Sequence, residues 1–267
     1  MLTRSQNKKG LTRFNDITIC IDRSGSMAIF SDSVRDGVID LLQTHGDAAA
    51  SAEVDYNLRI VSFDNNVTVL YTGSASELID DIGQLDSSKL ELITRGLMPR
   101  GTTRLYDTVM EEIKAQSDRC TAYKAGVSAE VCRLGLSMSV IFILLTDGED
   151  NASDSPINIA APLLCRTMEE HCKNFSVSAQ FIAANQNAIE TGTSLGFPAD
   201  TCLQMDADPH HGRAAMASAT ASSMRTVSGQ DSAFRECERA ASSQLSDHDP
   251  WSMDHSVGSL DIRPSRN

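Results

Sequence analysis

The sequence has no long hydrophobic run and a shortage of basic residues, and both absences exclude classes of protein. No stretch approaches the roughly 18 apolar residues that a membrane-spanning helix needs. The first 14 residues carry Arg and Lys but no apolar run with a small-residue cleavage site, so no secretory signal is predicted and a cytoplasmic location is expected. Lys and Arg number 23 against 36 Asp and Glu, which gives a net charge of −13. This balance disfavours nucleic acid as a partner, because affinity for phosphate depends mainly on Lys and Arg.

Paired cysteine motifs are also missing. The seven cysteines form an odd set without a C-x-x-C pair, so neither a zinc site nor a redox motif is predicted. Cys20 and Cys202 fall in apolar runs, where a free thiol is typical of a small core residue. Cys120 and Cys132 flank a polar stretch and could form a disulfide only in an oxidising compartment.

Hydrophobic residues make up 41% of the 267 residues, which is enough to bury a core. Apolar runs rich in β-branched residues alternate with amphipathic stretches. This alternation is typical of an α/β fold with a Rossmann-like, doubly wound, mostly parallel central sheet and helices on both faces. The runs 16–21 and 139–145 are almost continuously apolar, which predicts central strands buried on both faces. Between 54–63 and 67–71 lie turn-forming residues, so a hairpin with one antiparallel edge strand is expected.

The same patterns predict further strands and a set of helices. Strands are expected over 175–183 and 201–205, and helices over 31–50, 76–82, 105–116, 157–173, 187–195 and 211–226.

These elements divide the chain into one domain with two flanking segments. The expected domain covers 15–227, preceded by a basic N-terminal tail over 1–14. Within it, 117–137 has little periodicity and is interpreted as a surface insertion. The C-terminal extension, 228–267, becomes rich in Ser, Asp, His and Pro and is expected to be flexible.

Three predicted loops carry oxygen ligands. Asp22, Ser24 and Ser26 follow the first central strand, Thr103 precedes a helix, and Asp147 follows the second central strand. Open α/β sheets bind ligands at the carboxyl ends of strands, where the strand order reverses. Carboxylate and hydroxyl oxygens suit Mg²⁺, which prefers near-octahedral oxygen coordination and keeps some of its waters. The five residues therefore form a candidate metal site.

Each of these residues also has an ordinary structural interpretation. Ser and Asp after a strand can cap a helix N-terminus, and Thr103 could do the same for the helix that follows it. Asp147-Gly148 is a common turn sequence. The nearby acidic residues Glu149, Asp150 and Asp154 are interpreted as a solvated rim rather than as ligands.

Taken together and in this order, three blocks resemble the metal-binding motifs of the von Willebrand factor A (vWA) domain. They are Asp22-Arg23-Ser24-Gly25-Ser26-Met27, Gly101-Thr102-Thr103-Arg104-Leu105-Tyr106-Asp107 and Leu145-Thr146-Asp147-Gly148. The resemblance covers about 15–227. The segments at 181–186 and 193–196 further resemble the stand-alone vWA proteins of bacteria and their phages.

The resemblance implies a metal-ion-dependent adhesion site, or MIDAS. Ser24, Ser26 and Thr103 would be direct or near-direct ligands, and Asp22 and Asp147 would bind directly or through water. The family usually has two glycines before its threonine, whereas the second is Thr102 here. That leaves Thr102 and Thr103 as candidates, and the spacing to the following helix favours Thr103.

The surroundings of these ligands favour binding over catalysis. No His or Lys lies in the three loops, so no general base, nucleophile or leaving-group acid is evident beside the ligands. We therefore expect a non-enzymatic protein-binding module that holds Mg²⁺, with Mn²⁺ or Ca²⁺ as alternatives, and in which a partner Asp or Glu completes the metal. The resemblance implies a protein partner such as a co-encoded ATPase or assembly protein, and neither nucleic acid nor membrane.

Two other functions remain open from the sequence. The protein could be a scaffold or assembly component whose metal is structural. It could also be a Mg²⁺-dependent phosphohydrolase, although Asp22-Arg23-Ser24 lacks the second carboxylate that such enzymes place two residues after the first.

Overall fold

The computed structural model describes residues 13–51, 55–80, 82–127, 137–147, 150–184 and 187–243. These residues form a six-stranded sheet in the order β3-β2-β1-β4-β5-β6. The strands are β1 (Arg13–Asp22), β2 (Asp55–Phe63), β3 (Val67–Ser74), β4 (Ser137–Thr146), β5 (Val177–Ala184) and β6 (Cys202–Met205). Only β3 runs antiparallel to its neighbour, at one edge. The predicted α/β class, mostly parallel sheet and antiparallel edge strand are confirmed.

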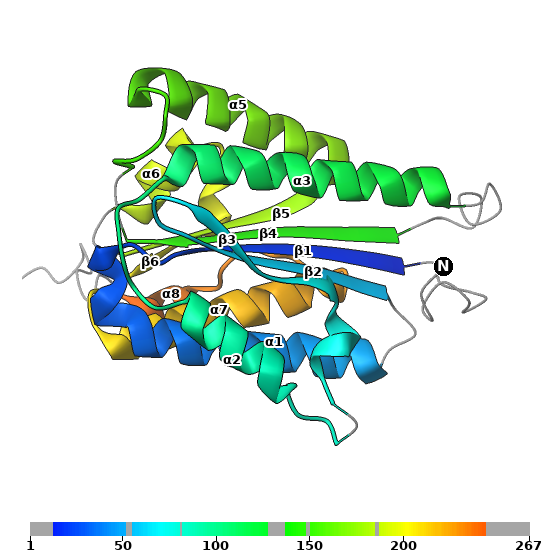
Figure 1. Cartoon of the computed structure of the whole chain (residues 1–267). Coiled ribbons are helices and arrows are strands. Elements are labelled where there is room, and N and C mark those ends of the chain that lie inside the picture. The colour runs from blue at the N-terminus through cyan, green and yellow to red at the C-terminus, as the bar shows by residue number, and fades with distance from the viewer. Residues whose placement is uncertain are drawn as a thin grey trace, which may run out of the picture.

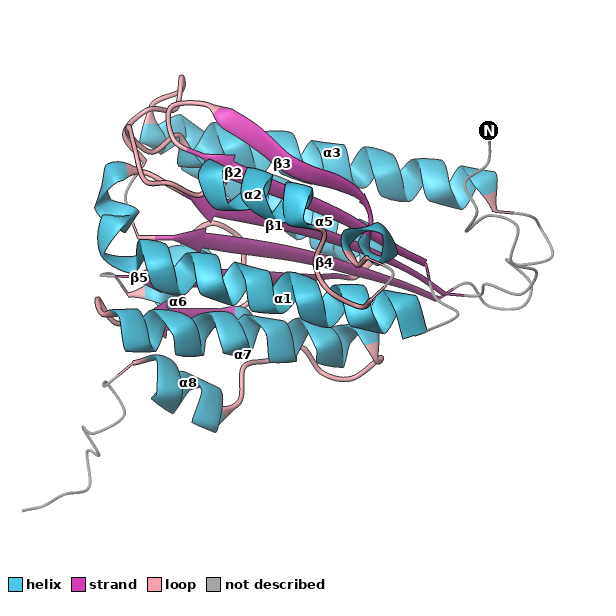
Figure 2. Ribbon diagram, turned by 60° about the horizontal axis from the view of Figure 1, so that its bottom comes forward, coloured by secondary structure: helices cyan, strands magenta, loops and turns pink. Residues whose placement is uncertain are grey.

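Helices cover both faces of the sheet (Figure 1). The α-helices are α1 (Ser31–Ser51), α2 (Ser87–Gly96), α3 (Leu105–Gly126), α5 (Ile157–Phe175), α6 (Ala188–Ser194), α7 (Pro209–Val227) and α8 (Glu236–Ser242), and short 3₁₀ turns are η2 (Gly25–Phe30), η3 (Ala75–Leu78) and η4 (Ala199–Thr201). Helices α3, α5 and α6 lie on one face, and α1, α2, α7 and α8 lie on the other. Figure 2 shows α1 and α7 side by side across the second face.

The two central strands supply side chains to two separate hydrophobic cores. Ile17, Ile19 and Ile21 of β1 pack into the core beneath α1 and α7, whereas Cys20 points into the core beneath α3 and α5. This alternation follows from the two-residue period of a strand. Because both faces are covered, the strand must be apolar on both, which explains its nearly continuous hydrophobic sequence.

Two α-helices, α2 and α8, were not predicted from the sequence. The expected helix over 76–82 is only the 3₁₀ turn η3, and α2 follows it. Asp86 caps α2, because its carboxylate accepts hydrogen bonds from the backbone N–H groups of Ser88 and Lys89. Within α2 the buried side chain is Ile93.

The expected insertion over 117–137 is partly wrong. Residues 117–126 continue α3, whose Cys120 is fully buried and whose Arg119 forms an ion pair with buried Asp16 at 2.9 Å. These polar contacts replace apolar periodicity in this part of the helix, which is why the pattern failed there. Residues 128–136, with Cys132, lie outside the described residues, and so does the Cys120–Cys132 pairing.

The boundaries at both ends also differ from the expectation. Phe14, assigned to the tail, lies within β1 and stacks on Tyr123 with ring centroids 3.8 Å apart. Residues 228–243 belong to the fold, since Phe234 is buried and Glu238 of α8 pairs with Arg225 of α7 at 2.6 Å. The rest of both flanking segments, 1–12 and 244–267, lies outside the described residues. Among the described helices, none has the length and apolar composition to cross a membrane.

Candidate metal centre

The candidate ligands lie at the carboxyl edge of the sheet, between its two central strands. β1 ends at Asp22 and the adjacent β4 ends at Thr146, with Ile21 and Leu145 paired in register. The chain turns from β1 to β2 on one side, while β4 and β5 lie on the other, so the strand order reverses here. This is the position at which doubly wound sheets bind ligands.

A chain of hydrogen bonds joins the first loop to the end of β4. Asp22 accepts from the Ser24 N–H at 2.7 Å and from the Thr146 hydroxyl at 2.7 Å. The Ser26 hydroxyl donates to Asp147 Oδ1 at 2.9 Å, and the Ser24 and Ser26 hydroxyl oxygens lie 3.0 Å apart. Since Ser26 gives its one hydrogen to Asp147, Ser24 is the donor in that pair. The structure thus brings Asp22, Ser24, Ser26 and Asp147 together.

The loop that carries Thr103 is tied to both of the others. Gly25 N–H donates to the Gly101 carbonyl at 3.2 Å, and Asn151 N–H donates to the Thr103 carbonyl at 2.9 Å. Thr103 is 2% exposed, whereas Thr102 is exposed to solvent. Burial therefore favours Thr103 over Thr102 as the threonine that faces the site.

Position 101 is the one in this loop that requires glycine, and the loop can therefore carry a threonine at 102. Its φ is +71°, a conformation that side-chain-bearing residues rarely adopt. A Cβ on Gly101 would also meet the Asn65 side-chain oxygen at 2.2 Å. The essential glycine of the block is thus the one that this chain keeps.

Asp150 and Asn151 have a role that the sequence did not reveal. The Asp150 carboxylate accepts from Leu105 N–H at 2.7 Å and so caps α3 from another loop. The Asn151 side chain accepts from Thr103 N–H at 2.8 Å. Interpreting Asp150 as part of a solvated rim was wrong, because its carboxylate caps α3. The sequence could not show this, since the two segments meet only in the folded chain. The only signal was the absence of a capping side chain at Arg104, the residue before α3.

The arginines of these loops are engaged away from the candidate ligands. Arg23 is 4% exposed and pairs with Asp64 at 3.1 Å, while Arg100 pairs with the same carboxylate at 2.7 Å. Asp64 follows β2, so it anchors two loops to the neighbouring strand end. The sequence predicted only a turn there.

The two site carboxylates are buried without a cationic partner. Asp22 and Asp147 are 1% and 8% exposed, and neither forms an ion pair with a described residue. Burial raises the pKa of Asp22 to about 6, and the charge of Asp147 contributes to that rise. Burial likewise raises the pKa of Asp147, whose Oδ2 is buried with no hydrogen-bond partner. Two uncompensated carboxylates beside hydroxyl oxygens are the environment that a hard divalent cation stabilises.

The composition of the cluster selects among metals. Within the described ranges, no three His, Cys, Asp or Glu side chains lie together, so hydroxyl and water oxygens would have to complete a metal site here. A site built from two carboxylates and hydroxyls lacks the nitrogen and sulfur ligands that structural zinc sites use. The residues present therefore fit an oxygen-coordinated ion with bound waters.

No protein-family profile matches the chain, and no curated protein is similar to it in sequence. Solved structures are similar in fold. A von Willebrand factor type A protein from Catenulispora acidiphila has a TM-score of 0.47 at 17% identity, over 79% of this chain and 43% of that one. The pilus adhesin SpaC from Lactobacillus rhamnosus GG reaches 0.54 at 14% identity, over 84% of this chain and 31% of that one. The chain shares the fold of this part of SpaC.

A further similar structure is that of proximal thread matrix protein 1 from the mussel byssus, solved with a zinc-occupied MIDAS motif. It has a TM-score of 0.48 at 15% identity, over 78% of this chain and 47% of that one. The chain spans less than half the length of each of these three proteins. At such identities the common property is the fold.

Proposed function

We propose that this protein is a non-enzymatic binding module whose vWA fold holds Mg²⁺ at the carboxyl edge of the sheet, where a carboxylate from a protein partner completes the coordination. The observation that carries the proposal is the pair of buried carboxylates, Asp22 and Asp147, without a cationic partner among the described residues. Ser24, Ser26 and Thr103 would hold the ion with them. When bound, the ion supplies positive charge and an open position for an oxygen ligand.

The chain's own residues prepare this position. The Ser24 N–H and the Thr146 hydroxyl fix both oxygens of Asp22, so that carboxylate is oriented before any ion arrives. Ser26 is exposed, and its hydroxyl reaches Asp147 at 2.9 Å, which puts these ligands at the surface end of the cluster. A partner would approach from this side. Ile29, 53% exposed on η2, offers an apolar contact nearby.

The basic side chains of the described loops support binding rather than hydrolysis, because they are engaged elsewhere. Arg23 and Arg100 pair with Asp64, and Arg104 pairs with Asp107 and Glu111. The six described cysteines are free thiols, which suits a reducing compartment, and the proposal includes a cytoplasmic location.

The proposal is tested with Mn²⁺, which replaces Mg²⁺ and reports on bound water through proton relaxation. Mn²⁺ should enhance water relaxation in the wild-type protein, and an Asp-containing peptide should lower that enhancement by displacing a metal-bound water. Ser24→Ala should abolish the enhancement. The exposed serine Ser76 gives the matched control, and Ser76→Ala should behave as wild type.

Two results would contradict it. If Mn²⁺ gives no enhancement above free buffer, the cluster holds no metal. If Mn²⁺ binds but no carboxylate reduces the enhancement, the metal is structural and the protein is a scaffold of the kind left open by the sequence.

A further inference from the structure

A cavity of about 350 Å³ opens between α3 and α5, which lie side by side over one face of the sheet (Figure 1). The facing sides of packed helices are normally apolar. Here six of the side chains that line the cavity carry polar groups: Lys114 and Ser117 of α3, and Thr167, Glu170, His171 and Asn174 of α5. The volume is within the range of small-ligand pockets.

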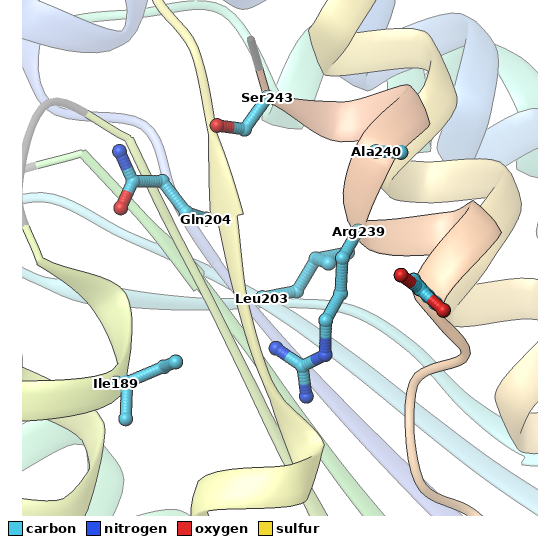
Figure 3. Close-up of a pocket in the computed structure, with 7 residues that line it drawn as sticks. Ile189, Leu203, Gln204, Arg239, Ala240 and Ser243 are labelled. Atoms are coloured by element: carbon cyan, nitrogen blue, oxygen red, sulfur yellow. The ribbon is translucent and has the colours of Figure 1, made fainter. Parts of the chain in front are cut away.

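A second cavity, of about 310 Å³, lies beside β6 (Figure 3). Glu236 and Arg239 place one negative and one positive charge next to the apolar side chains of Ile189 and Leu203. No contact among the described residues fixes which end of the Gln204 amide would meet a ligand there, so this lining selects no ligand class. In the cavity between α3 and α5, by contrast, such contacts fix the roles of the polar groups.

The hydrogen-bonding role of Ser117 follows from a chain of buried groups. Gln116 is fully buried, and its Nε2 donates to Asp16 Oδ1 at 3.0 Å and to the Ile141 carbonyl at 2.9 Å. Its Oε1 must therefore accept from His171 Nε2, which lies 2.9 Å away. Burial lowers the pKa of His171 to about 4, so at neutral pH the ring has only that hydrogen, and its Nδ1 accepts from the Ser117 hydroxyl at 2.9 Å. Only the oxygen lone pairs of Ser117 are left for a ligand.

Two more side chains of the lining can only accept hydrogen bonds from a ligand. The Thr167 hydroxyl donates to the Leu163 carbonyl of its own helix at 2.8 Å, so its hydrogen is also committed. The Glu170 carboxylate forms no ion pair with a described residue. The cavity thus holds three acceptor groups, and a primary ammonium group carries three N–H donors.

The lining also supplies hydrogen-bond donors and an apolar surface. Lys114 is exposed and forms no ion pair with a described residue, and the Asn174 amide adds further N–H groups. These donors suit a carboxylate. Met110 and Ile113 contribute apolar side chains to the same lining. A ligand that matches the whole lining therefore has an ammonium group, a carboxylate and a short apolar chain.

We propose that the cavity between α3 and α5 binds a free amino acid with an aliphatic or thioether side chain. The three acceptor groups bind its ammonium group, Lys114 and Asn174 bind its carboxylate, and Met110 and Ile113 contact its side chain. This inference does not depend on the metal centre or on the proposed function.

Calorimetric titration of L-leucine and of L-methionine into the full chain tests the proposal. At least one of them should bind saturably. 4-Methylpentanoate, which is leucine without its ammonium group, and 3-methylbutylamine, which is leucine without its carboxylate, should bind at least about tenfold more weakly than L-leucine.

Substitutions on the two helices locate the binding. Glu170→Gln and Lys114→Met should each raise the Kd of the bound amino acid by about tenfold, because each removes the charge that faces one end of the ligand. Glu169 and Lys173 are exposed on α5 and do not line the cavity, so Glu169→Gln and Lys173→Met are the matched controls and should bind as wild type.

Circular dichroism of each variant establishes that the domain is folded. The proposal is overturned if neither amino acid binds saturably up to about 10 mM. It is equally overturned if either truncated analogue binds as tightly as L-leucine, or if a folded cavity variant binds as its control does, since the amino acid then occupies another place on the protein.

Discussion

Asp22 is a carboxylate in a place where burial opposes its charge, and no described basic side chain compensates it. Its pKa of about 6 in the folded chain lies above the ordinary value of 3.8. Between these values the native state holds a proton that the unfolded state has released. Stability of the metal-free protein therefore falls as the pH rises from about 4 to 6, and the loss is complete above pH 6.

Because stability falls as Asp22 ionises, a substitution that removes its charge should stabilise the metal-free protein. Asp22→Asn removes the buried charge, so at pH 7.5 and in EDTA the variant should be more stable than wild type, by at most about 3 kcal/mol for a shift of two pKa units. Urea unfolding with EDTA from pH 4 to 8 measures this. Asp40, an exposed aspartate of α1, supplies the control, and Asp40→Asn should keep the wild-type profile. A metal-free Asp22→Asn protein less stable than wild type at pH 7.5 contradicts the account.

At the scale of elements, α3 starts where Thr103 ends its loop, and the start depends on Asp150 from the loop after β4. Asp150 thus caps the helix, while its neighbour Asn151 holds the backbone of the candidate ligand Thr103. The hydrogen bond between Leu105 and Asp150 joins two elements that are 45 residues apart in sequence.

Asp150→Ala should lower the free energy of unfolding by about 1–2 kcal/mol, as expected for a lost helix cap. It should also weaken Mg²⁺ binding, because the start of α3, two residues after Thr103, loses its cap. Asp154→Ala is the matched control, since the Asp154 side chain is 90% exposed. Urea unfolding and Mg²⁺ titration measure the two effects. If Asp150→Ala matches Asp154→Ala in both, the cap does not position the site.

The elements also show where sequence patterns are informative. The buried strands β1 and β4 could be predicted because burial on both faces demands continuous apolar residues. Helices α2 and α8 were not predicted, and the second half of α3 was missed because Arg119 there forms an ion pair with Asp16 in place of apolar contacts. The site residues at the ends of β1 and β4 were predictable from their place in the chain. Asp64 and Asp150 were not, since their partners become neighbours only in the folded chain.

At the scale of the whole molecule, the candidate site joins loops that are more than a hundred residues apart in sequence, as the 2.9 Å contact between Ser26 and Asp147 illustrates. In the unfolded chain these ligands are separated, so an ion that binds them binds the native state. Such binding raises stability by about 2.7 kcal/mol at a ligand concentration 100 times Kd. Mg²⁺ binding at this site should therefore raise the free energy of unfolding of the whole fold.

Calorimetric titration of Mg²⁺ into the EDTA-treated, dialysed wild-type protein, with Asp22→Asn and Asp40→Asn beside it, tests that claim most directly. We expect one Mg²⁺ per chain for wild type and Asp40→Asn, and no saturable binding for Asp22→Asn. Absence of saturable Mg²⁺ binding to the wild-type chain, or equal binding to Asp22→Asn, would contradict the assignment of this cluster as a metal centre.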